Sequence, residues 1–479
     1  MNNPLVLEII VVVLGLGLLL LDLWLPVERR RAFGHAAAGV LLLLLVGSFL
    51  MPLTDTAHAF GKMYVQDDLA IFFKRLFLLS GAVVLVMAVE HFDRLQTGLS
   101  EFFALVLFAL AGMMFAASAN DFTLLFVSVE LITVTFYVLT SFQRDRVNSL
   151  EAGIKYLILG ALSSAFMVFG IALVYGTTAK LNFGELAAVA PQFVANKIFL
   201  AGLLLVIVGL GFKIAAFPFQ MWAPDVYQGS PTPATAFLAV ASKAAGFVLL
   251  LRVLFTAAPQ ITAHWPTLLM VLSGVTILYG NLCALPQRNL KRLLGYSSIS
   301  NAGYLLLGVA ALSAAGQTAL LYYLAGYVFT VLAAFLVLTL VLRQVEGEDI
   351  TALAGLSQRS PMLAAILTLA MVSLAGVPPL AGFFGKFLLL KSVVEQAPGN
   401  PCYYWLLGAA VLGVVISLYY YFGVIQAIYW AKETPDLSAI EISLPMRISL
   451  CACTAGMLFL GLFPGSLVNF ATAAAHALK

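Results

Sequence analysis

Charged residues are scarce in this chain of 479 residues, because Asp, Glu, Lys and Arg together make up only 10% of it. A typical soluble domain carries about 25% charged residues, so the composition excludes a soluble globular enzyme and a disordered chain. The net charge of +3 is too small, and too diluted by apolar sequence, to form a basic groove for nucleic acid. We therefore expect no nucleic-acid partner.

Cysteine is also scarce, and sequence motifs for cofactors are missing. Four cysteines are too few for a disulfide scaffold, and their spacing offers no ligand set for an iron–sulfur cluster. The 38 glycines include no G-x-G-x-x-G after a strand, so no dinucleotide site is visible. We expect this chain to bind no cofactor and no metal ion.

Hydrophobic residues make up 62% of the chain and are grouped in long runs. A helix needs about 20 mostly apolar residues to cross the hydrocarbon core of a bilayer, and about fourteen runs satisfy this. The runs are too long for barrel strands and lack sustained alternation. The sequence therefore predicts a single membrane domain over 1–479, an all-α polytopic protein with about 14 transmembrane helices. The runs lie near 4–24, 33–52, 69–89, 101–118, 121–141, 151–175, 197–221, 231–255, 266–285, 291–312, 318–342, 361–390, 403–430 and 445–471.

The first run is interpreted as a retained helix, and the loop charges predict its orientation. A signal peptide would start with a positive residue, whereas this run follows no Lys or Arg and contains Glu8. Lys and Arg are concentrated in alternate loops, which the positive-inside rule assigns to the cytoplasm. Both termini are therefore predicted to be periplasmic. The positive loops contain Arg29, Arg30, Arg31, Arg94, Arg144, Arg146, Arg288, Lys291, Arg292, Arg343, Arg359, Lys432 and Arg447, and the opposite loops contain Lys62, Lys180 and Lys197.

Five charged side chains fall within the apolar runs: Glu130, Lys155, Lys213, Lys243 and Lys386. A charge at membrane depth costs at least a few kcal/mol, and such residues usually belong to ion or proton pathways. A lysine can instead extend its ammonium to the headgroups, and this alternative is strongest for Lys155, which lies near a helix end. Glu130 is too short for that and needs a partner or a proton. Because the five histidines lie in or near loops, we predict a proton relay of lysines, a glutamate and water.

Two of the predicted helices contain prolines that should break them. Pro218 follows Lys213 and precedes a polar turn, and Pro378 and Pro379 lie in mid-span ahead of Lys386. A proline removes a backbone donor and frees carbonyl groups, which a lysine can satisfy. Ordinary proline kinks are the alternative. Two breaks, each within a few residues of a buried lysine, favour an ion pathway.

Three segments resemble a known family. They are GFKIAAFPFQMWAPDVYQGSPTPATAFLAVASKAAGF, KRLLGYSSISNAGYLLLG and LAGVPPLAGFFGKFLLL. They resemble subunit N of bacterial NADH–quinone oxidoreductase (respiratory complex I), a member of the antiporter-like membrane subunits. The resemblance extends over the whole chain. Sister subunits and Mrp-type cation/proton antiporters share the layout but usually carry an LPDA-x-x-GPTPVSA-like turn, where this chain has WAPDVYQGSPTP.

The resemblance implies a fold of two inverted five-helix repeats with discontinuous helices 7 and 12. The repeats would cover 101–255 and 266–430, preceded by flanking helices in 1–100 and followed by a last helix in 445–471. It also implies roles for individual residues. Glu130, Lys213, Lys243 and Lys386 would carry protons, and Lys155 would support the Glu–Lys pair. Many members of the family have a histidine where this chain has Asn301, which can hold water but cannot carry a proton at neutral pH.

The implied function is proton translocation coupled to quinone reduction in partner subunits. This chain would hold no redox centre, whereas the whole complex would use FMN, iron–sulfur clusters, NADH and a quinone. The expected surroundings are the lipid bilayer of the bacterial inner membrane, the sister antiporter-like subunits and small membrane subunits. Three alternatives stay open: a subunit of an Mrp-type cation/proton antiporter, a subunit of a related complex with another electron donor such as ferredoxin, and a purely structural membrane anchor.

Overall fold

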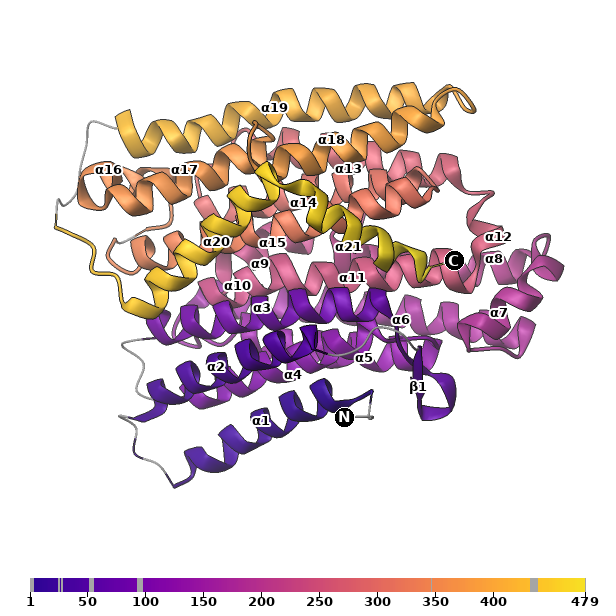
Figure 1. Cartoon of the computed structure of the whole chain (residues 1–479), viewed down its shortest axis with the longest axis horizontal. Coiled ribbons are helices and arrows are strands. Elements are labelled where there is room, and N and C mark those ends of the chain that lie inside the picture. The colour runs from indigo at the N-terminus through magenta and orange to yellow at the C-terminus, as the bar shows by residue number, and fades with distance from the viewer. Residues whose placement is uncertain are drawn as a thin grey trace.

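The structure is a computed structural model, which describes residues 4–24, 26, 29–50, 56–92, 98–345, 347–430 and 438–478. Its long helices lie roughly side by side along the longest axis of the molecule (Figure 1). Within the described residues, twelve helices are long and apolar enough to cross a membrane. The prediction of an all-α polytopic membrane protein is therefore confirmed.

The twelve helices include one composite helix at the centre of the bundle, Thr232–Ala257. This central helix comprises α10 (Thr232–Phe237), the π-helical η4 (Leu238–Ser242), α11 (Lys243–Leu251) and the π-helical η5 (Arg252–Ala257). The others are α2 (Arg30–Phe49), α3 (Asp68–His91), α4 (Leu99–Ala117), α5 (Phe122–Thr140), α6 (Val147–Thr178), α8 (Lys197–Ile214), α13 (Pro266–Ala284), α14 (Leu290–Ala310), α15 (Ala314–Leu342), α19 (Cys402–Trp430) and α20 (Leu444–Leu462).

Two further predicted runs form helices that are shorter than a full span. The run 4–24 forms α1 (Val6–Asp22), and the run 361–390 forms two helices, α17 (Pro361–Ala375) and α18 (Ala381–Gln396). The count of fourteen crossings therefore stays a prediction. The last run, 445–471, is not one helix but two, α20 and α21 (Pro464–His476). The helix is interrupted at Phe463, which has φ −126° and ψ 63°, because the following Pro464 lacks the N–H that a continuous helix needs.

Short elements connect the long helices. A hairpin follows α2: β1 (Ala57–Ala59) pairs antiparallel with β2 (Tyr64–Gln66) around the 3-10 turn η2 (Phe60–Lys62). The remaining connectors are α7 (Phe183–Val189), η3 (Ala190–Phe193), α9 (Trp222–Gly229), α12 (Pro259–Thr262), η6 (Ile350–Leu353) and α16 (Leu356–Arg359). Figure 1 shows both chain ends toward the side of the bundle that carries β1 and α7. Which side faces the cytoplasm stays a prediction, and two residues used for it, Arg94 and Lys432, lie outside the described residues.

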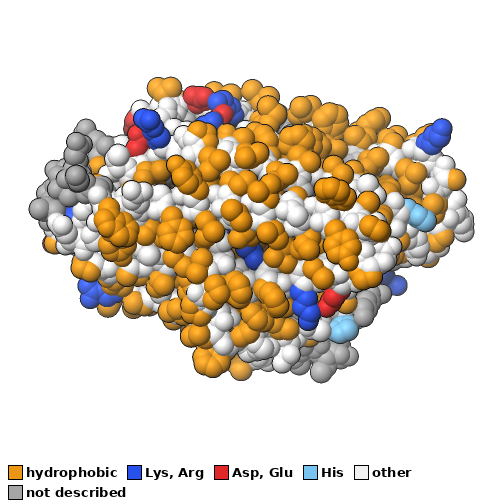
Figure 2. All heavy atoms as spheres, turned by 90° about the horizontal axis from the view of Figure 1, so that it is seen from above, with side chains coloured by type: hydrophobic (Ala, Val, Ile, Leu, Met, Phe, Trp, Pro, Cys, Tyr) orange, Lys and Arg blue, Asp and Glu red, His pale blue; other side chains and the backbone are white. Residues whose placement is uncertain are grey.

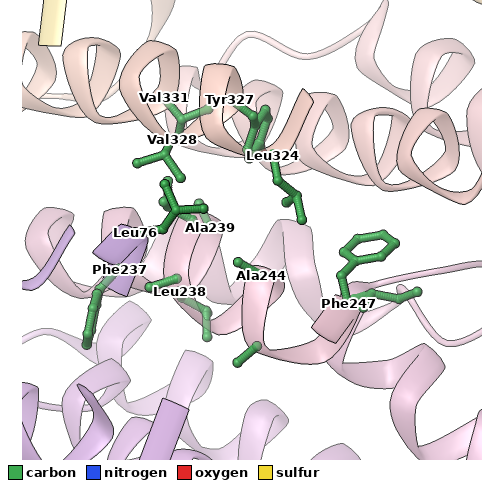
Figure 3. Packing of buried hydrophobic residues seen from close by; sticks show 14 of the residues in the cluster. Leu76, Phe237, Leu238, Ala239, Ala244, Phe247, Leu324, Tyr327, Val328 and Val331 are labelled. Carbon is green, nitrogen blue, oxygen red and sulfur yellow. The ribbon is translucent and has the colours of Figure 1, made fainter. Parts of the chain in front are cut away.

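The central helix, α14 and α15 form the interior of the bundle, and nearly all of their side chains are buried. Figure 3 shows Ala244 and Phe247 of the central helix facing Leu324, Tyr327 and Val328 of α15. The outer helices α2, α6, α19 and α20 expose most of their apolar side chains, and the face in Figure 2 is mostly hydrophobic with few charged groups. An apolar exterior suits lipid or neighbouring membrane subunits. The central helix lies inside this exterior, so a charge on it is surrounded by protein.

Candidate functional site

Both predicted helix breaks are present, and they share one backbone pattern. Helix α8 ends at Ile214, and Ala215 takes a left-handed conformation (φ 58°) before the chain resumes as α9. Helix α17 ends at Ala375, and Gly376 (φ 85°) occupies the same place before α18. In each break, a cis proline follows three residues after the left-handed residue. Each break frees backbone carbonyls inside the bundle, which need donors.

Lys386 supplies such a donor at the second break. Its Nζ donates a hydrogen bond to the carbonyl of Leu374 at 2.7 Å, and it lies 3.5 Å from the carbonyl of Ala375. It also lies 4.6 Å from the centroid of the Tyr304 ring, where the π-face attracts a cation. The side chain is buried, with 4% exposure. The lysine on α18 therefore caps the end of α17, in the way expected for a lysine beside a proline break.

Lys243 lies in the middle of the central helix, directly after η4. Its Nζ donates to the carbonyl of Ser298 at 2.5 Å and also to the Ser298 hydroxyl. The hydroxyls of Tyr227 and Tyr327 bond the same Ser298 hydroxyl at 3.0 Å and 3.2 Å. Ser298 on α14 therefore joins the central lysine to tyrosines from α9 and α15. This cluster is fully inside the protein.

Lys213 and Glu130, which the family resemblance implies are partners, do not contact each other directly. Lys213, in the last turn of α8, is 5% exposed, and within the described chain its Nζ has no hydrogen-bond partner. It lies 5.9 Å from the centroid of the Tyr156 ring. Glu130 on α5 accepts a hydrogen bond from Ser164 of α6 instead. The structure therefore leaves the Lys213 Nζ and the Glu130 carboxylate without a direct hydrogen bond.

Lys155 lies at the edge of the bundle. Its side chain is 40% exposed and forms ion pairs with Glu151 at 2.6 Å and with Asp225 of α9 at 2.7 Å. Arg292 of α14 also pairs with Asp225. The structure therefore uses Lys155 to tie α6 to the polar segment after the first break, and it does not bring Lys155 into the buried row.

Asn301 connects α14 to α15 by direct hydrogen bonds. Its Nδ2 donates to the carbonyl of Ser297 at 2.9 Å, and its Oδ1 accepts from the hydroxyl of Tyr323 at 2.5 Å. Tyr323 packs against Gly385, the neighbour of Lys386 in α18. Tyr323 and Tyr327 stand one helical turn apart on α15, so the two rings lie on the same face of that helix.

Sequence reasoning missed the hydroxyl groups and a second set of charges. Ser298, Tyr323 and Tyr327 were not singled out, although the polar segment KRLLGYSSISNAGY stands out within apolar sequence. A fully buried ion pair was also missed: Lys74 of α3 and Glu8 of α1 meet at 2.7 Å with no exposed side-chain surface. Across the part of the chain that the structure describes, no group of three or more His, Cys, Asp or Glu residues could hold a metal ion.

Fold and site together define a helical membrane protein with a buried row of ionisable and hydroxyl side chains. The family model described as NADH:quinone oxidoreductase/Mrp antiporter, transmembrane, matches residues 119–417, which is more than half of the chain. Subunit N of NADH-quinone oxidoreductase from Heliobacterium modesticaldum is 40% identical to this chain, over 98% of both chains. Subunit N from Rhodospirillum rubrum is 39% identical, over 99% of this chain and 97% of that one. The chain belongs to the subunit N branch of this family.

Solved structures agree with the fold. A chain of respiratory complex I from Thermus thermophilus with bound aureothin is 35% identical, has a TM-score of 0.81, and is matched over 97% of this chain and 98% of that one. A chain of the Mrp complex from Dietzia has a TM-score of 0.83, with 100% of this chain and 98% of that one covered. Its identity is only 20%, so that likeness concerns the fold alone.

Proposed function

We propose that this chain is the proton-translocating membrane subunit of an NADH–quinone oxidoreductase in a bacterial inner membrane. The observation that carries this is the burial of Lys213, Lys243 and Lys386, which are 5%, 2% and 4% exposed. Within the described residues none of the three forms an ion pair with a carboxylate. A buried ammonium without a counter-charge is costly, so these lysines are suited to binding and releasing protons. The subunit N relatives support the same function.

The hydrogen bonds suggest how a proton moves from Lys243 toward Lys386. Lys243 gives a proton to the Ser298 hydroxyl. The Tyr327 hydroxyl donates to Ser298 in the structure, so both hydroxyls turn before Ser298 releases its own proton to Tyr327. Each hydroxyl accepts one proton and releases another, so no charge stays on it. Water carries the proton from Tyr327 to Tyr323, one turn along α15, and then to Lys386. The amide of Asn301 positions the Tyr323 hydroxyl and is not itself a carrier.

The remaining groups act at the two ends of this route. Glu130 sets the electrostatic field at Lys213, and Lys386 exchanges its proton with one side of the membrane. We place FMN, iron–sulfur clusters, NADH and quinone on partner subunits, including sister antiporter-like and small membrane subunits of the membrane arm. Reduction of quinone there would shift the protonation of Lys213 and Lys243. The two inverted repeats, 101–255 and 266–430, would give each half its own broken helix.

The test replaces one lysine at a time in the intact complex. We expect Lys213→Ala and Lys243→Ala to abolish most proton pumping in proteoliposomes and to slow coupled NADH oxidation. Lys391→Ala is the matched control, because Lys391 also lies on α18 but has a side chain that is 59% exposed. Normal pumping by both variants, in complexes with a full set of subunits, would remove these lysines from the mechanism.

The alternatives predict different behaviour of the purified chain. A mild-detergent preparation of the tagged chain should co-purify other oxidoreductase subunits and show inhibitor-sensitive NADH–quinone reductase activity. Cation/proton antiport without NADH would favour an Mrp-type antiporter. Co-purification with redox subunits that accept electrons from ferredoxin would favour the related complex.

A further inference from the structure

Two adjoining cavities open at the end of the bundle where the loop 143–146 meets the segments 343–345 and 347–350. The outer cavity measures about 1050 Å³ and the inner one about 190 Å³. Both are lined by Arg146, Arg343 and Glu348. The floor of the inner cavity is formed by Ser230, Lys291 and the first turn of the central helix. The cavity pair therefore leads from the surface to the helix that carries Lys243.

A buried ion pair lies on that floor. Lys291, at the start of α14, is 3% exposed and meets Glu348 at 2.8 Å, whereas the Glu348 side chain is 25% exposed to the cavity. The backbone around Glu348 is fixed, because Leu290 N–H donates to its carbonyl at 2.8 Å and Ile350 N–H donates to Arg288 at 2.8 Å. Glu348 is therefore a positioned carboxylate between solvent and a buried ammonium.

Beside this pair lies a buried hydroxyl with no bond to other protein groups. Lys291 Nζ donates to the carbonyl of Ser230 at 3.0 Å. Ser230 is 1% exposed, and its Oγ finds no hydrogen-bond partner in the described chain. A buried polar atom that lines a cavity and lacks a protein partner indicates a place where water binds.

A polar face of α14 continues inward from this point. Lys291, Gly295 and Ser298 are spaced by four and three residues, so they lie on one side of the helix. Tyr227 packs against Gly295, and its hydroxyl bonds Ser298 at 3.0 Å. Seven residues of helix span about 10 Å, so Ser298 lies about that far along α14 from Lys291.

We propose that this cavity pair is the entrance through which protons reach Lys243, and that the Glu348–Lys291 pair controls it. This inference rests on the proposed function. Glu348 takes a proton from water in the cavity, which neutralises its carboxylate and loosens Lys291. Lys291 then passes an N–H proton inward, through water at Ser230 and the hydroxyls of Tyr227 and Ser298, to a neutral Lys243. Glu348 returns its proton to the Lys291 amine, so one proton has moved and the pair is restored.

The charges around the opening favour a proton over a metal cation. Arg146 and Arg343 line both cavities, and His91 lines the inner one. Arg343 is partly balanced by Glu90 at 3.1 Å. Positive side chains repel a hydrated Na⁺ ion, whereas a proton can pass along hydrogen-bonded water without an ion crossing the rim.

The first experiment uses Glu348→Gln in the complete complex, reconstituted in proteoliposomes. Gln keeps the size of the side chain but cannot take up the proton, so we expect proton pumping per NADH oxidised to fall at least about tenfold. The control is Glu185→Gln, because Glu185 is an exposed carboxylate paired with Lys180 at 2.9 Å on the opposite set of loops. Wild-type pumping by Glu348→Gln would overturn the proposal.

Lys243→Ala, measured in the same series, separates the proposed entrance at Glu348 from the proposed proton-translocating function. If Lys243→Ala abolishes pumping but Glu348→Gln does not, the entrance is wrong and the proposed function stands. If neither variant loses pumping, Lys243 does not carry protons and the route proposed for this chain fails.

A labelling experiment tests the cavity even if Glu348→Gln does not assemble. Ser230→Cys places a thiol on the floor of the inner cavity. We expect a small membrane-impermeant thiol reagent to label this cysteine only when it is added on the side of the membrane where the two cavities open. The parent chain, which has cysteines of its own, gives the background labelling to subtract. No added labelling, or labelling from the opposite side, would contradict an entrance here.

Discussion

Gly461→Ala should distort the second helix break, although Gly461 itself lies on a neighbouring helix. Gly461 lies on α20 and faces the junction between α17 and α18. A Cβ at this position would stand 2.0 Å from the carbonyl oxygen of Pro379 and 2.6 Å from the carbonyl carbon of Leu380. Ordinary contact begins at 3.4 Å, so the two segments would have to separate by about 1.4 Å. The Tyr322 hydroxyl donates to the carbonyl of Leu460 on α20 at 2.5 Å, which resists a shift of α20, so we expect the break to move.

That displacement should affect pumping more than stability. Overpacking a buried contact costs about 1–3 kcal/mol, which a large membrane complex can tolerate. A shift of about 1 Å at a reacting group, however, can cost about 10²-fold in rate. The carbonyl of Leu374, which accepts from Lys386 at 2.7 Å, lies in the last turn before this break. We therefore expect proton pumping to fall by about ten- to a hundredfold.

The assay is proton uptake by proteoliposomes per NADH oxidised, with the thermal unfolding of the complex measured alongside. Gly423→Ala is the matched control, because Gly423 lies on α19 and an added Cβ would meet nothing within 4 Å. If Gly461→Ala pumped like the wild type at an unchanged unfolding temperature, the close packing of α20 on the break would be irrelevant to function.

Two further substitutions test other parts of the structure. Lys74→Met would leave Glu8 as a buried, unpaired carboxylate, so we expect the free energy of unfolding to fall by about 3–5 kcal/mol. Thermal unfolding of the purified complex measures this, and adding Glu8→Gln should recover most of the loss; a stable single variant would be evidence against the pair. Tyr323→Phe keeps the ring against Gly385 but removes the hydroxyl that donates to Asn301. Pumping should then drop severalfold while stability changes by about 1 kcal/mol, and unchanged pumping would exclude this hydroxyl from the route.

Features that depend on local chemistry could be predicted from the sequence. The helix breaks follow from Pro218 and Pro379, because a proline cannot donate to a helix whatever surrounds it. The buried lysines were found because a charge in an apolar run is costly anywhere along the chain. The overall class follows from the length and number of the apolar runs.

Features that depend on distant contacts could not be predicted. Glu8 and Lys74 are 66 positions apart, and no local pattern indicates that α1 and α3 bring them together. Ser298 is one of three serines in α14, and nothing in the sequence distinguishes it from the others. Only the approach of the central helix makes it the partner of Lys243. For Lys155 the sequence left both a buried and a headgroup-reaching side chain open, because its exposure depends on which face of α6 turns outward.

The placement of Lys213 before its proline and of Lys386 after its own looks inconsistent in the sequence, but in the structure each lysine is associated with the last turn of the half-helix that ends at its break. Lys213 stands two residues before the left-handed Ala215, and Leu374 stands two residues before the left-handed Gly376. Lys386 reaches back and donates to the carbonyl of that Leu374.

Each break therefore brings a lysine to the C-terminal end of a half-helix, where unpaired carbonyls carry partial negative charge and favour a cation. At the second break, the bond from Lys386 to the Leu374 carbonyl shows how an ammonium is accommodated there without a carboxylate partner. Under the proposed function, the same arrangement would help such a lysine to give up its proton. A helix end attracts a cation less strongly than a full negative charge does, so loss of the proton leaves no buried anion behind.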